Sequence, residues 1–153
     1  MEQEITDITN TYLEKTRYKL IDLLIKGEKK NRIVEIFVDS IDPVSLDDLT
    51  IISKDLNQIL SESDLNSSIS KLIVSSPGVD KPFKFDWQLK KHIGRTLEIQ
   101  TNEGEKLEAK LSGMPSDGML SLTKKIKKGK KHETEEIELD FNDIKSSKDK
   151  IEF

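Results

Sequence analysis

The chain contains no cysteine, and it has only 7 glycines and 4 prolines among its 153 residues. The lack of cysteine excludes disulfide frameworks, thiolate metal sites and cysteine nucleophiles, and it fits a reducing cytoplasmic location. No stretch approaches the roughly 18 apolar residues of a membrane span, and the acidic start Met1–Asp7 lacks the apolar segment of an export signal. We therefore expect a cytoplasmic protein without a membrane-spanning segment.

Groups typical of catalytic sites are also scarce. The two histidines, His92 and His132, are isolated without metal-like spacing, so we expect surface roles for both. The sequence has no hydrolase-like pattern of serine, histidine and aspartate, and no glycine-rich loop that could hold a phosphate. These absences predict a protein that is not an enzyme and that binds no cofactor or metal.

Charge is abundant but unevenly distributed. Residues 1–83 hold 10 Lys and Arg against 15 Asp and Glu, whereas residues 84–153 hold 15 against 14. The resulting net charge of −4 argues against a protein that simply coats nucleic acid. Within the second half, however, six lysines fall between residues 124 and 131, and four glutamates follow between residues 133 and 138. This arrangement predicts a dipolar surface.

Periodicity in the first half predicts an α-β-β-α-β order. Ser45 offers a hydroxyl to free amides at a helix start, and Asp48 follows three residues later with a favourable charge. We expect helices over residues 2–16 and 45–62, and strands over residues 18–26, 32–39 and 71–75. These elements predict an α+β domain with one sheet, over residues 1–83.

Short strands dominate the second half. Short apolar patterns predict strands over 96–100, 107–111, 119–123 and 136–139, with the lysine segment as a loop and a last strand or turn near 141–145. This number of strands in about 60 residues favours a small barrel over a sandwich, in a domain spanning residues 84–153. Before the strands, Asp86 is expected to cap a short helix that turns Trp87 and Ile93 inward and ends at Gly94.

The junction between the halves is rich in conformational restrictions. Pro77 and Gly78 suit the two central positions of a type II turn, and Pro82 keeps Lys81 out of helical geometry. We therefore expect a stiff connection rather than a flexible linker. The residues predicted to form this interdomain hinge or contact are Ser75, Ser76, Pro77, Gly78, Asp80, Lys81 and Pro82.

Four stretches of the chain together resemble the RimP family of ribosome maturation factors: Val34–Asp39, Val44–Asp48, Val74–Phe83 and Leu139–Ile144. The resemblance covers nearly the whole chain, and Ser-Ser-Pro-Gly followed by Asp-Lys-Pro is its most specific part. Two departures from the family pattern stand out. Lys81 replaces the usual arginine, so a bidentate contact becomes a point charge, and Lys15–Tyr18 replaces the usual glycine before the first strand.

The resemblance implies a KH-like N-terminal domain followed by a Sm-like (Src-homology-3-like) β-barrel. It also implies a monomeric, non-catalytic protein that binds the free small (30S) ribosomal subunit and assists its assembly. The implied partners are ribosomal RNA and a basic ribosomal protein, the twelfth of the small subunit.

Three groups of residues are candidates for these contacts. The first group is the lysine run, which suits contacts to RNA phosphates, although a charge run of this kind is commonly a solvated surface. Its members are Lys124, Lys125, Lys127, Lys128, Lys130 and Lys131. We expect the junction to act mainly as a hinge, with Asp80 and Lys81 as a local ion pair, and a contact of this segment with ribosomal protein or RNA is the compatible alternative. Four acidic residues could attract a basic ribosomal protein, although two of them also belong at a helix start: Asp39, Asp42, Asp47 and Asp48.

An alternative from another class is a Sm-like regulator that binds small or messenger RNA as a ring. The large N-terminal half and the near-neutral C-terminal half oppose it. Because a ring needs a stable oligomer, sizing chromatography distinguishes the two hypotheses. A hydrolase or transferase is a third hypothesis, for which the sequence offers no convergent polar pocket.

Overall fold

The computed structural model describes residues 1–78, 81–129 and 131–150. The chain divides into two compact units, Met1–Pro77 and Gly78–Phe153. The first unit mixes helices and strands, and the second is built on a single antiparallel sheet, so the α+β class is confirmed. The division into domains 1–83 and 84–153 stays a prediction.

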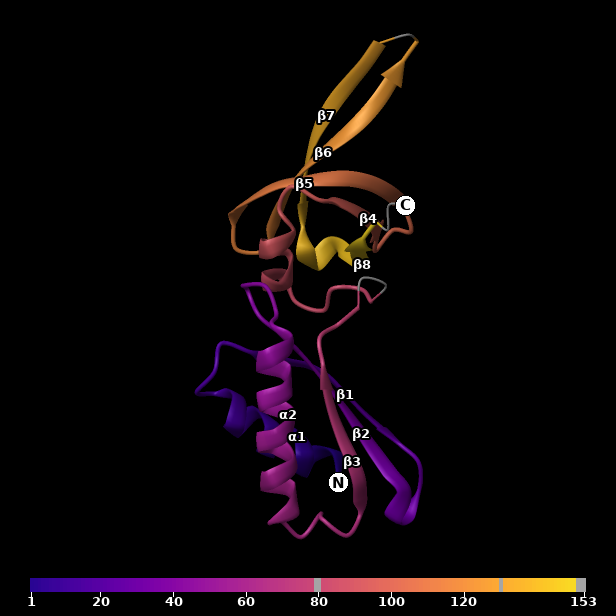
Figure 1. Cartoon of the computed structure of the whole chain (residues 1–153). Helices are drawn as coiled ribbons and strands as arrows, with labels where there is room; N and C mark the ends of the chain where they lie inside the picture. Colours follow the sequence, from indigo (N-terminus) through magenta and orange to yellow (C-terminus); the bar gives the residue numbers. More distant parts are fainter. Residues whose placement is uncertain (79–80, 130, 151–153) are drawn as a thin grey trace. The chain divides into compact units, whose positions relative to one another are not determined.

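The first unit has the expected order of elements (Figure 1): α1 (Glu2–Leu13), β1 (Lys19–Lys26), β2 (Arg32–Asp39), α2 (Leu46–Ser61) and β3 (Ile69–Ser75). A single turn of 3-10 helix, η1 (Lys29–Asn31), lies between β1 and β2. The central strand β2 pairs antiparallel with β1 and parallel with β3. Because parallel neighbours need a crossover, α2 supplies the connection from β2 to β3.

Helix α2 begins where its sequence predicts. The side chain of Ser45 accepts a hydrogen bond from the amide of Asp48 at 3.3 Å, which satisfies one of the free amides of the first turn. Asp47 and Asp48 also place negative charge at the positive end of the helix dipole. The apolar stripe that follows is buried at Leu49, Ile52, Leu56 and Leu60.

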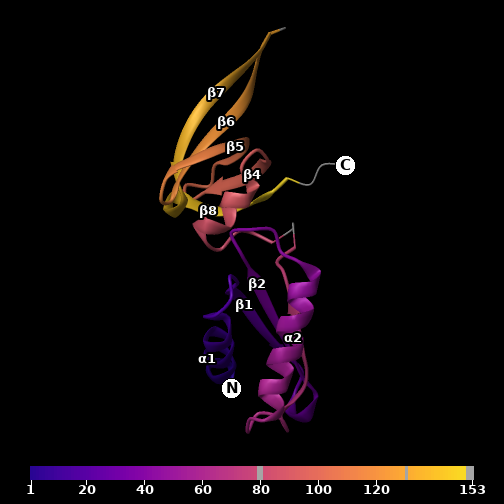
Figure 2. The same ribbon diagram turned by 60° about the vertical axis from the view of Figure 1, so that its left-hand side comes forward.

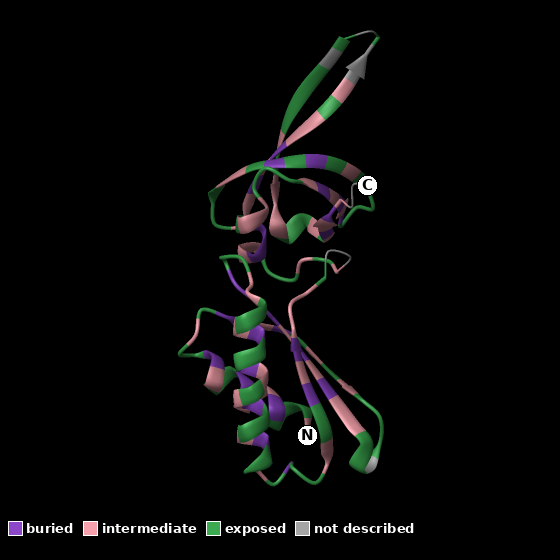
Figure 3. Cartoon of the chain, in the orientation of Figure 1, coloured by how far each residue is buried: buried purple, intermediate pink, exposed green. Residues whose placement is uncertain are grey.

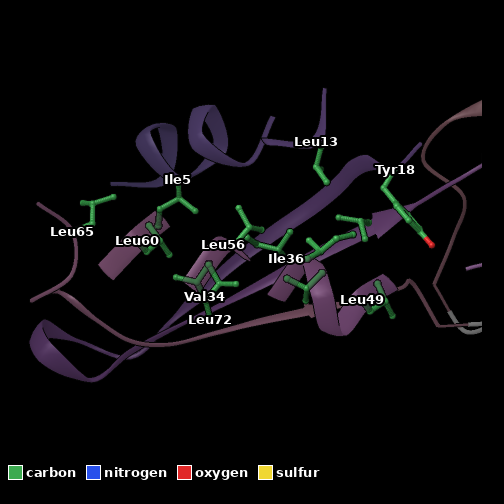
Figure 4. Packing of buried hydrophobic residues seen from close by; sticks show 13 residues of the cluster. Ile5, Leu13, Tyr18, Val34, Ile36, Leu49, Leu56, Leu60, Leu65 and Leu72 are labelled. Atoms are coloured by element: carbon green, nitrogen blue, oxygen red, sulfur yellow. The ribbon is translucent and has the colours of Figure 1, made fainter. Parts of the chain in front are cut away.

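The core of the first unit lies between the two helices and one face of the sheet. Alternate residues of β2, Val34, Ile36 and Val38, have 0% of their surface exposed. They cluster with apolar residues of both helices and with Leu72 and Val74 of β3 (Figure 4). The intervening residues of β2 are mostly only partly buried, so the helices cover one face of this sheet.

The second unit is a five-stranded antiparallel sheet in the order β7-β6-β5-β4-β8 (Figure 2). Its elements are η2 (Asp86–His92), β4 (Thr96–Thr101), β5 (Lys106–Ser116), β6 (Met119–Lys128), β7 (Lys131–Asp140), η3 (Phe141–Asp143) and β8 (Ile144–Asp149). Within residues 81–129 and 131–150, no pairing joins the outer strands β7 and β8. The sheet is therefore open along this order, and the expected closed barrel is not confirmed.

The middle strand β5 is curved (Figure 1), and it is longer than the strand over residues 107–111 that the alternation of apolar residues predicts. The register with β6 shifts on both sides of Gly113, where a residue without a Cβ suits a bulge. The strand continues to Ser116, and the turn that follows uses Gly118 at a φ of +78°. The core of this unit comprises Leu89 of η2 and residues of three strands: Leu97, Ile99, Ala109, Leu111, Leu120 and Leu122.

Truncating the α2 stripe should destabilise the first unit. Leu56 has 0% of its surface exposed, so Leu56→Ala should lower the free energy of unfolding by about 2–5 kcal/mol. Ile51, on the same helix, is 56% exposed, and Ile51→Ala should change it by less than about 0.5 kcal/mol. Urea denaturation followed by circular dichroism measures both. Equal losses of stability in the two variants would contradict this packing.

Candidate functional site

The lysine segment lies mainly on paired strands rather than in a loop. β6 runs to Lys128 and β7 resumes at Lys131, with Gly129 between them at a φ of +61°. The expectation of a lysine loop is therefore wrong, because ladder pairing with β7 extends β6 through the lysines. Lys130 lies outside the described residues, as do the side chains of Lys127 and Lys128. Beyond Thr123, the last residue of β6 that pairs with β5, the two strands continue past the rest of the sheet as a two-stranded ribbon, the β6–β7 ribbon (Figures 1 and 2).

Acidic residues of β7 lie opposite part of the basic strand. Lys124 pairs in register with Glu135, and Ile126 with Glu133, so each has a carboxylate-bearing residue directly across the ladder. Lys125 pairs with Thr134 and is exposed, and Lys131 is exposed at the start of β7. Figure 3 shows most of β7 exposed in this part. The ribbon therefore presents the exposed lysines Lys125 and Lys131, with the exposed Glu133 and Glu135 interleaved with them along the ladder.

The junction leaves the first unit at the end of β3 and enters the second through fixed contacts. Ser75 ends β3, and the amide of Lys81 donates to the carbonyl of Gly78 at 3.0 Å. The amide of Phe83 then donates to the carbonyl of Ser147 in β8 at 2.7 Å. Residues 79 and 80 lie outside the described residues. The type II turn expected at Pro77 and Gly78 would end at residue 79, so it stays a prediction. The hinge role of Ser75, Ser76, Pro77, Gly78, Asp80, Lys81 and Pro82 stays a prediction.

Helix η2 buries residues other than those expected. Gln88 is 1% exposed, and its Oε1 accepts the amides of Lys84 at 2.8 Å and Phe85 at 2.9 Å. Leu89 is 0% exposed, whereas Ile93 is 47% exposed. Trp87 is half-buried and stacks on Phe85 with ring centroids 5.9 Å apart. The inward placement of Trp87 and Ile93 is therefore wrong, because η2 buries Gln88 and Leu89 instead and ends at His92, before Ile93.

His92 is part of a partly buried charge cluster, so the expected surface role is wrong. Its Nδ1 lies 2.9 Å from Asp149 Oδ2, and the ring packs edge-on against Phe83 at 4.7 Å. Arg95 Nη1 also contacts Asp149, at 3.3 Å. Burial lowers the pKa of His92 below its ordinary value, and the nearby Asp149 opposes this shift. His132, the other histidine, has its side chain outside the described part of the chain.

The four acidic candidates do not form one surface of free carboxylates. Asp39 is 4% exposed, and its Oδ1 accepts the amide of Ser40 at 2.8 Å. Asp48 accepts from the Tyr18 hydroxyl at 2.6 Å and pairs with Arg17 at 3.0 Å. Asp42 and Asp47 are exposed. Of the four candidates, Asp42 and Asp47 are therefore the two exposed residues.

A network around Arg17 holds the loop before α2. Arg17 Nη1 donates to Ser40 Oγ at 3.0 Å, and Nη2 donates to the Pro43 carbonyl at 3.2 Å. The hydrogen bond from Tyr18 lowers the pKa of Asp48 most, and Arg17 lowers it further. Burial, followed by the bond to Asp48, raises the pKa of Tyr18. No periodic pattern indicates this network, because its members come from three separate segments of the sequence.

Comparison with known proteins finds a similarity to the RimP family. A model of the RimP N-terminal domain matches residues 8–80. The ribosome maturation factor RimP of Cytophaga hutchinsonii is 28% identical over 149 residues, which cover 92% of this chain and 89% of the relative. The chain is similar to the RimP family along most of its length. The RimP N-terminal match includes the second half of α1 and all of β1, β2, α2 and β3, while the similarity to the RimP relative extends through both units.

Neither a metal-binding cluster nor a membrane-spanning helix occurs among the described residues. Among residues 1–78, 81–129 and 131–150, no group of three or more His, Asp or Glu side chains is arranged to hold a metal ion. Neither α1 nor α2 is long and apolar enough to cross a membrane, and the same holds for every helix in the described part of the chain.

The His92–Asp149 pair should make stability depend on pH. Because the pKa of His92 is lowered in the folded state, the unfolded chain takes up this proton first as the pH falls. The free energy of unfolding should therefore decline as the pH drops below about 6.5. Well above that value His92 is neutral in both the folded and the unfolded chain, and its protonation should not lower the stability. Urea denaturation followed by Trp87 fluorescence measures the decline at several pH values. His92→Gln should flatten it, and an unchanged decline in that variant would contradict the assignment.

Proposed function

We propose that this chain is a ribosome maturation factor that binds the free small ribosomal subunit and assists its assembly. The family match and the name of the relative support a role in ribosome maturation. The observation that carries the subunit contact is the lysine-rich end of the β6–β7 ribbon, which places exposed ammonium groups beyond the body of the sheet. Folded ribosomal RNA offers the dense phosphates that such a surface attracts.

The ribbon acts by neutralising phosphates. Each lysine that contacts a phosphate releases condensed counterions, which makes binding favourable at low salt and weaker as salt rises. Phosphate contacts fix the position and orientation of a protein without reading sequence. Double-helical RNA suits this mode, because its deep and narrow major groove hides the base edges. The lysines that would make these contacts are Lys124, Lys125, Lys127, Lys128, Lys130 and Lys131.

A basic ribosomal protein, the twelfth of the small subunit, is proposed as a second partner. The exposed residues Asp42 and Asp47 lie before and within the first turn of α2, next to the exposed apolar residues Ile41 and Leu46. Complementary charge speeds the encounter of such partners. Asp39 and Asp48 would act indirectly, since Asp39 is buried and Asp48 holds the Arg17 network.

The protein is proposed to be a cytoplasmic monomer in which both units contribute to binding. The first is a KH-like fold, and the second is a variant of the Sm-like fold in which β6 and β7 are extended. The anchoring of Phe83 to Ser147 and of residues 84 and 85 to Gln88 supports a stiff start to the second unit. The protein would favour one conformation of an assembly intermediate by binding it more tightly than others, with no bond made or broken.

Neutralising the ribbon should weaken binding to purified small subunits. The fourfold variant Lys124→Gln, Lys125→Gln, Lys127→Gln and Lys128→Gln should lower affinity by about tenfold or more at low salt. It should also flatten the logarithmic salt dependence by about 1 for each phosphate that is no longer neutralised. Filter binding over a range of salt concentrations measures both quantities.

A matched control removes the same charge from exposed lysines elsewhere in the second unit: Lys90, Lys106, Lys110 and Lys145, each changed to Gln. This control should keep most of the affinity. Equal reductions in affinity in the two fourfold variants would show that only net charge matters, and unchanged binding in the ribbon variant would remove the ribbon from the interface.

A further inference from the structure

A hollow of about 660 Å³ lies between α2 and the outer edge of β3 in the first unit. One wall is a stripe of α2 that includes Thr50, Ser53, Lys54 and Asn57, and the other is the strand segment Lys71–Ser76. The outward surface of α2 is largely exposed (Figure 3). We call this hollow the α2–β3 groove. It is separate from the β6–β7 ribbon and belongs entirely to the first unit.

The charge of the α2–β3 groove is opposite to that of the unit that contains it. Residues 1–77 carry 9 Lys and Arg against 14 Asp and Glu, yet no carboxylate lines the groove. Lys54 and Lys71 face it from the two walls, and both are exposed. Arg17 and Lys26 pair with carboxylates at 3.0 and 3.4 Å, whereas no ion pair of Lys54 or Lys71 is found among the described residues. The groove therefore suits an anionic chain.

The β3 edge distinguishes between two kinds of anionic chain. An acidic peptide would bind most simply by adding a strand to this edge, which requires free backbone groups. Asn57 Nδ2, however, donates to the carbonyl of Leu72 at 3.2 Å, so a side chain already occupies the edge at its middle. A sugar-phosphate backbone needs ammonium and hydroxyl groups instead, and the groove supplies Lys54, Lys71 and the side chains of Ser75 and Ser76. The hydroxyl of Thr50, which also lines the groove, donates to the carbonyl of Leu46 at 3.0 Å.

We propose that the α2–β3 groove binds a short single-stranded segment of RNA through its phosphates. Leu46, which is 81% exposed, and the half-buried Ile73 offer apolar contacts to the sugars and bases. No aromatic side chain lines the groove, so base stacking contributes little and the phosphates provide most of the affinity. Binding is therefore tolerant of sequence and strongly dependent on salt.

Amide chemical shifts of the full chain, labelled with ¹⁵N and titrated with a short oligouridylate, test the proposal. The amides of Thr50–Asn57 and Lys71–Ser76 should shift. The double variant Lys54→Gln, Lys71→Gln should reduce the affinity read from these amides by about 20-fold at 0.1 M salt, and the salt slope by about 1.4, since each single-strand phosphate contact adds about 0.7. Lys15→Gln, Lys19→Gln removes the same charge from exposed positions outside the groove and should change neither.

A second pair of variants tests the groove without removing a lysine. Thr50→Glu places a carboxylate in the groove and should abolish the groove shifts, whereas Thr50→Gln, of similar size, should preserve them. Thr50 is exposed, so both variants should keep the circular dichroism of the parent chain.

Three results would overturn the proposal. They are shifts confined to residues outside the groove, groove shifts that persist unchanged in the Lys54 and Lys71 double variant, or groove shifts produced by an oligoglutamate of matched charge but not by the RNA. The last result would assign the groove to an acidic peptide. Because the experiment uses no ribosomal subunit, its failure leaves the proposed role of the β6–β7 ribbon unaffected.

Discussion

The backbone ladder between β6 and β7 is the interaction on which the functional account depends. Its register runs without a shift from Met119 and Asp140 to Lys128 and Lys131. Like charges on a flexible loop would repel one another and spread, whereas the ladder holds successive residues at fixed intervals of about 3.4 Å. The same ladder brings Glu133 and Glu135 opposite β6, so the ribbon balances part of its own charge. Because the ladder already holds the backbone of these lysines, only their side chains lose conformational entropy when they contact phosphates.

Features set by local periodicity were predictable from the sequence. The Ser45 cap and the Leu49–Leu60 stripe depend on residues within a few positions of one another, and α2 has the expected bounds within about one residue. The strands β1 and β2 likewise follow from β-branched runs separated by a charged turn. The junction motif was informative for another reason, because its combination of residues resembles one family and led to the expectation that the comparisons confirm.

Features set by contacts between distant segments were not predictable. His92 stands isolated in the sequence because its partner, Asp149, lies 57 positions away, and the Arg17 network joins residues up to 31 positions apart. The lysine segment was expected to be a loop because a charge run has low strand propensity, but pairing with β7 outweighs that preference. Similarly, the α2–β3 groove depends on the crossover that places β3 beside β2, and no sequence motif indicates it.

Together, the ribbon and the groove describe a protein of net negative charge that gathers exposed positive charge in two separate places. The most direct test of the account is to fractionate a cell lysate on a density gradient and to probe for this chain in the free small subunits, the whole ribosomes and the soluble fractions. The account predicts that the chain sediments with free small subunits and that cells lacking it accumulate immature small particles. A chain found only in the soluble fractions, with normal small particles in cells that lack it, would contradict the account.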